Sequence, residues 1–110
     1  GDYAFYDAKS LTDITLPEGL TDVGTSVFMN CTALKSIVIP TTLTYLGERM
    51  FYNATSLSSV TLPSTLRIIG EYAFADCPVL NEISLPLKLD YIANSSVYGC
   101  PKLELIDNKD

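Results

Sequence analysis

The sequence contains no histidine, the side chain that most often serves as a general base near neutral pH. Its serines and threonines therefore have no histidine that could activate them as nucleophiles. Its three cysteines form no Cys-x-x-Cys motif, so the usual ligand spacing of a zinc site is also missing. These absences argue against a hydrolase and against a metal centre, and we expect no cofactor.

Positive charge is also scarce. The chain has 7 Lys and Arg residues against 13 Asp and Glu, a formal net charge of −6, and the basic residues are scattered. Nucleic acids and anionic membrane surfaces both attract clustered positive charge, so both are disfavoured as partners. No apolar run approaches the roughly 20 residues of a membrane-spanning helix, so membrane insertion is not expected. The glycines fall singly, which argues against a phosphate-binding loop.

The sequence does contain a repeat of 23 residues along its whole length. Leucine recurs at this interval at Leu11, Leu34, Leu57, Leu80 and Leu103. A branched apolar residue follows three positions later, at Ile14, Ile37, Val60, Ile83 and Ile106. The repeating unit reads L-x-x-I-x-L-P-x-x-L-x-x-I-G-x-x-x-F-x-x-C-x-x. A fixed period of this length indicates a stacked array in which each unit contacts its neighbours.

We therefore treat residues 1–110 as a single repeat domain. It is divided into a partial repeat 1–10, full repeats 11–33, 34–56, 57–79 and 80–102, and a partial repeat 103–110. Neither end shows the polar cap that stacked arrays normally carry. We expect either a neighbouring repeat or end-to-end self-association through the uncapped units.

Each repeat predicts a short strand and a return path. In residues 11–16 Ile14 and Leu16 would point inward, and Asp13 and Thr15 outward. The proline after each strand has no N–H to donate and would end the pairing. A second extended stretch would end at Gly24 with a positive φ, and residues 26–31 would form one short helical or 3-10 turn. The predicted fold is a solenoid of short parallel strands with little α-helix.

Two blocks of the sequence, residues 57–63 and 69–77, resemble the BspA-like leucine-rich repeats, a 23-residue class. The resemblance covers the whole chain and implies a leucine-rich-repeat solenoid. It also implies a cell-surface or secreted protein used in adhesion, without a catalytic motif. Three positions depart from the pattern: Ala54 replaces cysteine, Ala93 replaces glycine and Val97 replaces phenylalanine.

The outward residues of the strands form the first candidate binding surface. They are Asp13, Thr15, Lys35, Ser36, Val38, Ser59, Thr61, Glu82 and Ser84. Solenoids commonly bind proteins on such extended faces, although Ser and Thr also simply suit a solvent-facing strand. Asp13 and Glu82 would lie three repeats apart, about 14 Å, which is too far for a glycosidase carboxylate pair.

Tyrosines and cysteines supply further candidates. The aromatic candidates are Tyr45, Tyr52, Tyr91 and Tyr98, which would serve an interface or cover the edge of the core. Cys31, Cys77 and Cys100 share one column with Ala8 and Ala54. We interpret them as buried, reduced structural thiols. Cys77 and Cys100 would be within Cα range of a disulfide, so a bridge between them stays open.

The sequence thus favours a non-enzymatic protein-binding or adhesion module that uses the exposed parallel sheet. Its partner would be a protein, for example a host or extracellular matrix protein. The location, at the cell surface or outside the cell, is implied by the resemblance alone. The alternative is a structural spacer or stalk segment of a larger surface protein, with no ligand of its own.

Overall fold

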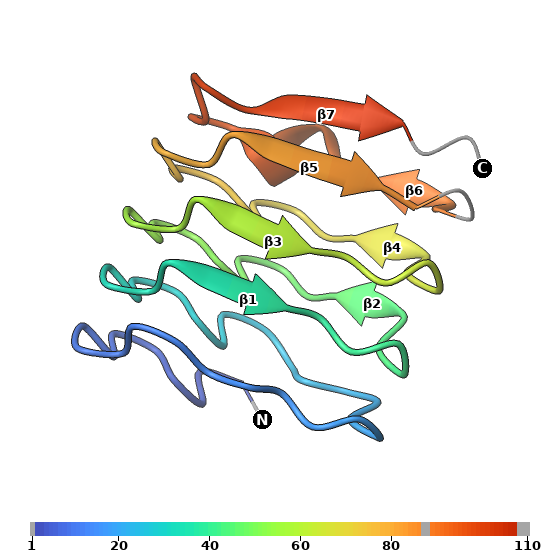
Figure 1. Ribbon diagram of the computed structural model, residues 1–110, viewed down its shortest axis with the longest axis horizontal. Helices are drawn as coiled ribbons and strands as arrows, with labels where there is room; N and C mark the ends of the chain where they lie inside the picture. The colour runs from blue at the N-terminus through green and yellow to red at the C-terminus, as the bar shows by residue number, and fades with distance from the viewer. Residues whose placement is uncertain (1, 87–88, 108–110) are drawn as a thin grey trace.

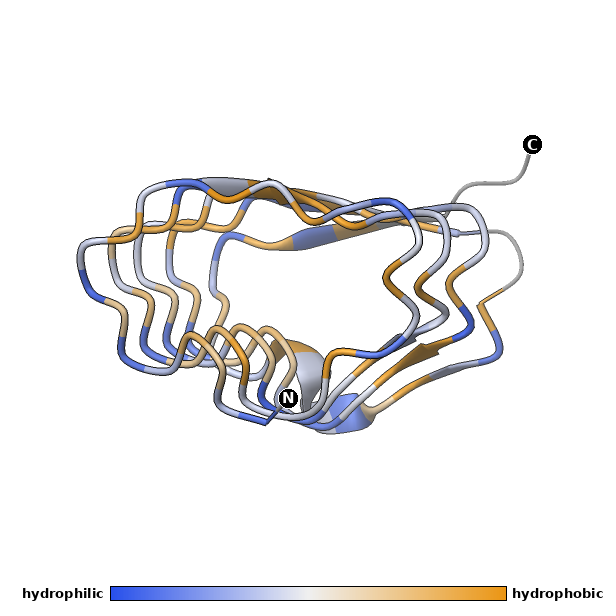
Figure 2. Ribbon diagram, turned by 90° about the horizontal axis from the view of Figure 1, so that it is seen from below, coloured by the Kyte–Doolittle hydropathy of each residue, from blue (hydrophilic) through white to orange (hydrophobic). Residues whose placement is uncertain are grey.

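The computed structural model describes residues 2–86 and 89–107, and these stack as a solenoid (Figure 1). We call residues 11–33, 34–56, 57–79 and 80–102 rungs 1 to 4. Residues 2–10 form an N-terminal half-rung and residues 103–107 a C-terminal half-rung. Seen along the stack, the rungs nearly superimpose as flattened coils (Figure 2).

Two parallel sheets run the length of the stack. The front sheet has the strand order β1 (Ser36–Val38), β3 (Ser59–Thr61), β5 (Glu82–Leu85) and β7 (Glu104–Asp107). The side sheet has the order β2 (Tyr45–Leu46), β4 (Ile68–Ile69) and β6 (Tyr91–Ile92). Among the described residues, the one helical segment is the 3-10 helix η1 (Asn94–Val97). The architecture is the leucine-rich-repeat solenoid that the sequence predicts.

The strand residues alternate between core and solvent as predicted. In β1 Ser36 and Val38 are exposed and Ile37 is buried, and β3 repeats this pattern. β1 and β3 pair with an offset of 23 residues, for example Ile37 with Val60. Like residues therefore meet like residues, and Leu34, Leu57 and Leu80 are fully buried in one core.

A stack of phenylalanine rings forms the opposite wall of this core. Phe5, Phe28, Phe51 and Phe74 follow one another with centroids 5.4 Å apart and nearly parallel planes. Such offset stacking adds to the energy gained by burying the rings. The column ends in rung 4, where Val97 takes the place of phenylalanine.

The turn side differs from its prediction in rungs 1 to 3. The predicted helical turn over residues 26–31 is wrong, because the chain there alternates through left-handed residues. Two columns have positive φ: Tyr3, Ser26, Arg49 and Tyr72, and then Asp7, Asn30, Asn53, Asp76 and Gly99. Every second N–H thereby points to the next rung, as in Phe28 N to Met50 O at 2.9 Å. These bonds form a third ladder, the intervening N–H groups bond within the turn, as in Met29 N to Ser26 O at 3.3 Å, and among the described residues only rung 4 has a 3-10 helix.

The strand predicted over residues 11–16 is also not formed. One backbone bond, from Lys35 N to Thr12 O at 3.2 Å, ties the start of this segment to rung 2. Among the described residues no strand lies on its other side. A segment with one neighbour has half the ladder bonds of an interior strand, but β7 also has one neighbour and is formed, so this alone does not account for the irregular backbone.

The last strand shifts by one residue from the predicted column. β7 pairs Leu105 with Ile83 and Ile106 with Ser84, so the prediction that Ile106 continues the Ile83 column is wrong. Leu105 and Ile106 are both apolar, so either one suits the core position. The Leu-Pro or Ile-Pro pair that follows the inward residue in rungs 1 to 4 is missing here, so this signal of the register is absent.

The recurring glycines Gly24, Gly47 and Gly70 are needed for close packing of the backbone more than for a positive φ. Gly24 has the predicted positive φ of 76°, but Gly47 and Gly70 do not lie in the left-handed region. A Cβ on Gly70 would come within 2.9 Å of Leu46 O, and one on Gly47 would collide with Gly24 O. Glycine is thus needed where the backbones of adjacent rungs approach each other.

Candidate functional site

The candidate surface on the front sheet is built by the ladder register. Ser36 pairs with Ser59 and Ser59 with Glu82, which makes one exposed row along the stack. Val38 and Thr61 pair in a second exposed row, and Ser84 is exposed on β5. Lys35 lies exposed immediately before β1. The face is flat and mostly polar, with one apolar side chain, Val38, at 63% exposure.

The front face is hollowed at its N-terminal side into a groove of about 550 Å³. Of the nine predicted face residues, Asp13, Thr15, Ser36 and Val38 line it. The others do not: Lys35, Ser59, Thr61, Glu82 and Ser84. The structure therefore divides the predicted surface into a groove over rungs 1 and 2 and a flat sheet beyond it.

The groove lies where rung 1 departs from the sheet. Thr12 is bonded to Lys35 N, and at the far corner Thr42 Oγ1 donates to Leu20 O at 2.7 Å and accepts from Gly19 N at 3.1 Å. Between these ties residues 13–17 form no strand. Their side chains therefore line one wall of the groove, with β1 as the other.

The groove has negative charge at one wall. Asp13 and Glu18 line it, and Glu18 Oε1 accepts a hydrogen bond from Thr41 Oγ1 at 2.9 Å. Both carboxylate side chains belong to exposed residues. The chemistry offered is two carboxylates and the hydroxyls of Thr15 and Ser36 beside the exposed methyl groups of Val38. This combination can bind an extended chain segment carrying a basic residue.

The four predicted tyrosines fall in two places. Tyr45 and Tyr91 are exposed on the side sheet, with Ile68 paired between them in the ladder. Tyr52 and Tyr98 lie on the turn side, where Tyr98 is 66% exposed. None of the four lies on the front face, so the structure does not combine the two predicted sets of residues into one site.

The sequence reasoning missed Tyr72 and Arg49. Tyr72 lies edge-to-face against both Tyr52 and Tyr98, with centroid distances of 6.3 and 6.4 Å. The guanidinium of Arg49 lies 5.3 Å from the Tyr72 ring centroid. Ala75 could have indicated this cluster. It is a small residue in the column of Tyr52 and Tyr98, and Tyr72 lies three residues before it. We call Arg49, Tyr52, Tyr72 and Tyr98 the tyrosine cluster.

All three cysteines are free thiols; Cys31 and Cys77 are buried as predicted, but Cys100 is only partly buried, so the prediction of a buried thiol is wrong there. The Sγ atoms of Cys31, Cys77 and Cys100 donate to Phe5 O, Phe51 O and Phe74 O, at 3.2, 3.3 and 2.8 Å. Each thiol thus bonds the carbonyl of a phenylalanine in the preceding rung or half-rung. Ala54 fills the same space without the bond.

Two of these thiols also interact with each other. The interaction of its side chain with that of Cys100 raises the pKa of Cys77, with burial adding to the rise. The same interaction lowers the pKa of Cys100 to about 7. Burial raises the pKa of Cys31. Cys100, which is only half-buried, is therefore the most reactive thiol of the three.

Residues 2–86 and 89–107 contain no group of three or more His, Cys, Asp or Glu side chains arranged to hold a metal ion. Over the same ranges, no helix is long and apolar enough to cross a membrane.

Comparison with known proteins places this geometry in a wider group. The family model for the BspA type leucine rich repeat region matches residues 1–110 in six copies. No functionally curated protein matches the sequence.

The solved structures that are similar to the chain include the following three. A leucine rich cell surface protein of Faecalibacterium prausnitzii is 30% identical with a TM-score of 0.90, over 97% of this chain and 28% of that protein. The leucine rich repeat protein of T. pallidum is 28% identical with a TM-score of 0.91, over 94% and 49%. A leucine-rich repeat protein of Bacteroides ovatus is 27% identical with a TM-score of 0.72, over 97% and 30%. The chain thus spans less than half the length of each.

Proposed function

Because this chain belongs to the BspA-type leucine-rich repeat family, we propose that it is a non-enzymatic protein-binding module of a cell-surface protein. The module holds an extended segment of a protein partner along the outer face of the front sheet. Its similarity to a cell surface protein of Faecalibacterium prausnitzii supports the location. The proposed partners are host proteins or extracellular matrix proteins.

The observation that carries the proposal is the groove of about 550 Å³ that opens onto the exposed rows of the front sheet. One wall carries Asp13 and Glu18, and the other includes Val38 of β1. An extended segment lying there would continue over Ser59 and Thr61, since the ladder aligns these with Ser36 and Val38. A flat row of small side chains lets a partner backbone approach closely, and the carboxylates favour a basic residue in it.

A binding screen against extracellular matrix proteins and host-cell ectodomains tests the proposal. Two front-face variants, Ser36→Arg in the groove and Thr61→Arg beyond it, are expected to weaken any binding by roughly tenfold or more through bulk and like charge. Thr44→Arg is the matched control, because Thr44 is also exposed but immediately precedes β2 of the side sheet. Equal binding by all three variants and the wild type would place the site elsewhere.

A spacer or stalk function is the second candidate, and one observation favours it. The described outward residues of β1, β3 and β5 include no aromatic residue and no arginine, the types that most often anchor protein interfaces. A spacer would bind nothing in the screen, and neither front-face substitution would change any property of the chain except its charge.

A further inference from the structure

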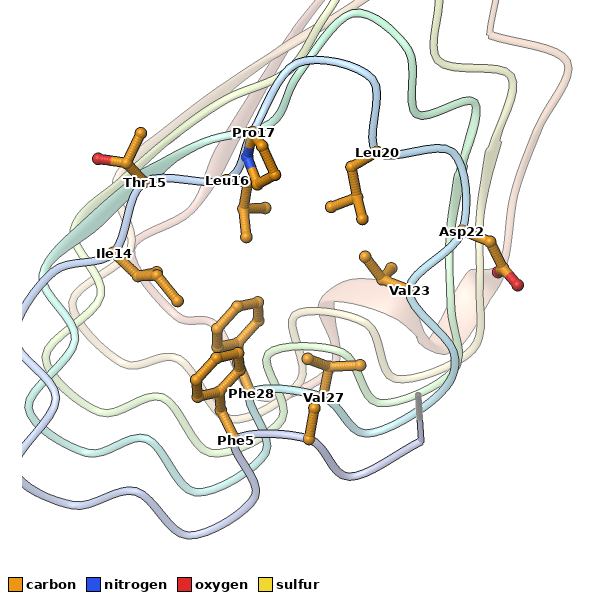
Figure 3. A pocket seen from close by; sticks show the side chains of 11 residues that line it. Phe5, Ile14, Thr15, Leu16, Pro17, Leu20, Asp22, Val23, Val27 and Phe28 are labelled. Carbon is orange, nitrogen blue, oxygen red and sulfur yellow. The ribbon is translucent and has the colours of Figure 1, made fainter.

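The apolar columns of the repeat point into the core, and the tyrosine cluster is an exception to this rule. Figure 3 shows the rule around a cavity of about 290 Å³ in rung 1, where Ile14, Leu16 and Phe28 point into the cavity and Asp22 points away from it. The rings of the tyrosine cluster instead lie at the outer surface of the turn side. They are therefore aromatic surface that the core does not use.

The exposure of these rings is found in the interior of the stack. Tyr52 belongs to rung 2 and Tyr72 to rung 3, and on the turn side each of these rungs is hydrogen-bonded to a rung on either side. Both tyrosines are nevertheless only partly buried, whereas the inward Phe51 and Phe74 beside them in the sequence are fully buried. Tyr52 and Tyr72 thus remain at the surface with rungs stacked on both sides of them.

The backbone ladder of the turn side holds the cluster in place. Tyr52 O accepts a hydrogen bond from Asn30 N at 2.8 Å, and Tyr98 O accepts one from Asp76 N at 2.7 Å. The rings also support one another, since the central ring meets each of the other two edge to face. Tyrosine and arginine are the types most enriched among the residues that dominate binding energy. A surface of such residues that is already ordered loses little conformational entropy on binding.

The spacing of the rings indicates the kind of partner. Tyr52 and Tyr98 stand in one column two rungs apart, which corresponds to about 10 Å at a strand spacing of about 4.8 Å. A polyproline II helix rises about 3.1 Å per residue with three residues per turn, or about 9.3 Å per turn. Prolines three residues apart in such a helix therefore match Tyr52 and Tyr98, and the ring of Tyr72 lies between these two. Aromatic side chains are the usual docking surface for this helix.

The charges around the cluster favour a basic residue in the same segment. Exposed Glu71 directly precedes the central tyrosine, and Asp76 is bonded to Tyr98 through its backbone. Within residues 2–86 and 89–107 neither carboxylate forms an ion pair, whereas the charge of Arg49 is balanced by Glu48 at 2.7 Å. A positive charge on the partner is therefore attracted here, most strongly at low ionic strength.

We propose that the tyrosine cluster binds a proline-rich segment of a protein partner, which lies along the stack as a polyproline II helix and carries a basic residue. Two prolines three residues apart pack on Tyr52 and Tyr98. The tyrosine hydroxyls donate to carbonyl groups, which this helix leaves without internal partners. The basic residue lies beside Glu71. The cluster is on the turn side, so this inference does not rest on the binding function proposed for the front face.

Titration of the chain with a fluorescent twelve-residue peptide of alanine, proline and one arginine, with proline at every third position, tests the proposal by anisotropy. We expect a Kd below about 1 mM, and binding weaker by roughly tenfold for a peptide of the same composition with its prolines two residues apart. Tyr98→Ala should weaken binding by roughly tenfold, and its exposure makes a folding defect unlikely to interfere. Tyr91→Ala is the matched control, because exposed Tyr91 lies on the side sheet and should leave the Kd unchanged.

The role of charge is tested separately. Glu71→Gln should weaken binding of the arginine peptide by roughly threefold at low salt, and should not change binding of a peptide with alanine in place of arginine. The proposal is overturned if neither peptide spacing binds, if both bind alike, or if Tyr98→Ala and Tyr91→Ala have equal effects. Binding of cellohexaose that is lost in Tyr98→Ala, with neither peptide bound, would also overturn it and would assign the cluster to glycans.

Discussion

Rungs 2 and 3 differ from rungs 1 and 4 although all four share one sequence pattern. In the interior rungs both strands are formed, the phenylalanine rings stack on both faces and the core columns are closed. Rung 1 has no strand and an open cavity, and rung 4 has a 3-10 helix and Val97 in the phenylalanine column. The structure of a rung is thus decided by its neighbours as much as by its own residues.

The largest expected difference between interior and end lies in the phenylalanine stack. Phe51 is fully buried between two rings, whereas Phe5 is 39% exposed and stacks on one. We expect Phe51→Ala to lower the free energy of unfolding by about 3–5 kcal/mol, and Phe5→Ala by roughly half of that. Urea denaturation measures both, and equal losses would contradict the assignment of residue 5 to an open end.

The glycine column gives the next largest effect. A Cβ on Gly47 would collide with the backbone of rung 1, whereas Ala93 already occupies this column in rung 4. We expect Gly47→Ala to cost about 1–3 kcal/mol, as overpacking does elsewhere. Ala93→Gly is the control, with a cost below about 1 kcal/mol, and thermal melting compares the two. An unchanged melting temperature for Gly47→Ala would show that the rungs can separate at no cost.

A buried hydroxyl marks rung 4 as the less well packed. Ser96 is fully buried in the column of Met50 and Ala73, and its Oγ has no hydrogen-bond partner in the part of the chain that the structure describes. Ser96→Ala is expected to raise the free energy of unfolding by about 1 kcal/mol, because an unpaired buried hydroxyl is removed. Ser95→Ala, at the less buried neighbour, should change it little, and a destabilised Ser96→Ala would reveal a bond to that hydroxyl.

The last comparison concerns the reactivity of two thiols, Cys77 and Cys100, and involves no change in stability. Because the pKa of Cys100 is lowered to about 7, its thiolate fraction grows as pH rises through that value, and alkylation should accelerate there. Cys77, whose pKa is raised, should stay unmodified in the folded protein. Mass spectrometry after iodoacetamide treatment separates the two.

The Cys77→Ala variant is the control for the cause of this shift. It removes the side chain whose interaction lowers the pKa of Cys100, so the rise in alkylation should move to higher pH. A Cys100 profile that is the same with and without Cys77 would assign the lowered pKa to something other than this interaction.

The core of the fold was predictable because apolar residues of the same type recur every 23 residues. The columns of Leu34, Ile37 and Phe28 predict inward residues, and all three are buried. The outward residues Ser59 and Thr61 follow from the period of two in a strand. What could not be predicted depends on neighbours. The sequence of residues 11–16 is as strand-like as that of β1, yet it forms no strand beside β1, whereas β7 at the other end of the sheet does form.

The left-handed backbone on the turn side could have been predicted in part from the sequence. The column Asp7, Asn30, Asn53, Asp76 and Gly99 contains only residues that tolerate positive φ, and all five adopt it. Asn53 Nδ2 even donates to Asn30 Oδ1 of the rung below at 2.9 Å. The column of Tyr3, Ser26, Arg49 and Tyr72 has no such composition, so its left-handed backbone could not be foreseen.

Of the candidate site, the sequence predicts the exposed rows but not the groove. The rows follow from alternation alone, whereas the groove requires rung 1 to leave the sheet between Thr12 and Leu20. The tyrosine cluster was half predicted, since Tyr52 and Tyr98 share a column but Tyr72 reaches them from another. Contacts between columns depend on side-chain size in the neighbouring rung, which a search for periodicity alone does not reveal.

The three ladders have a mechanical consequence. Their hydrogen bonds run from rung to rung, so they point along the direction in which the coils stack. A tensile load applied at the two termini therefore acts on the outermost rung first. It breaks the hydrogen bonds of that rung one after another. Such a molecule would peel from an end at low force rather than resist until it ruptures as a whole.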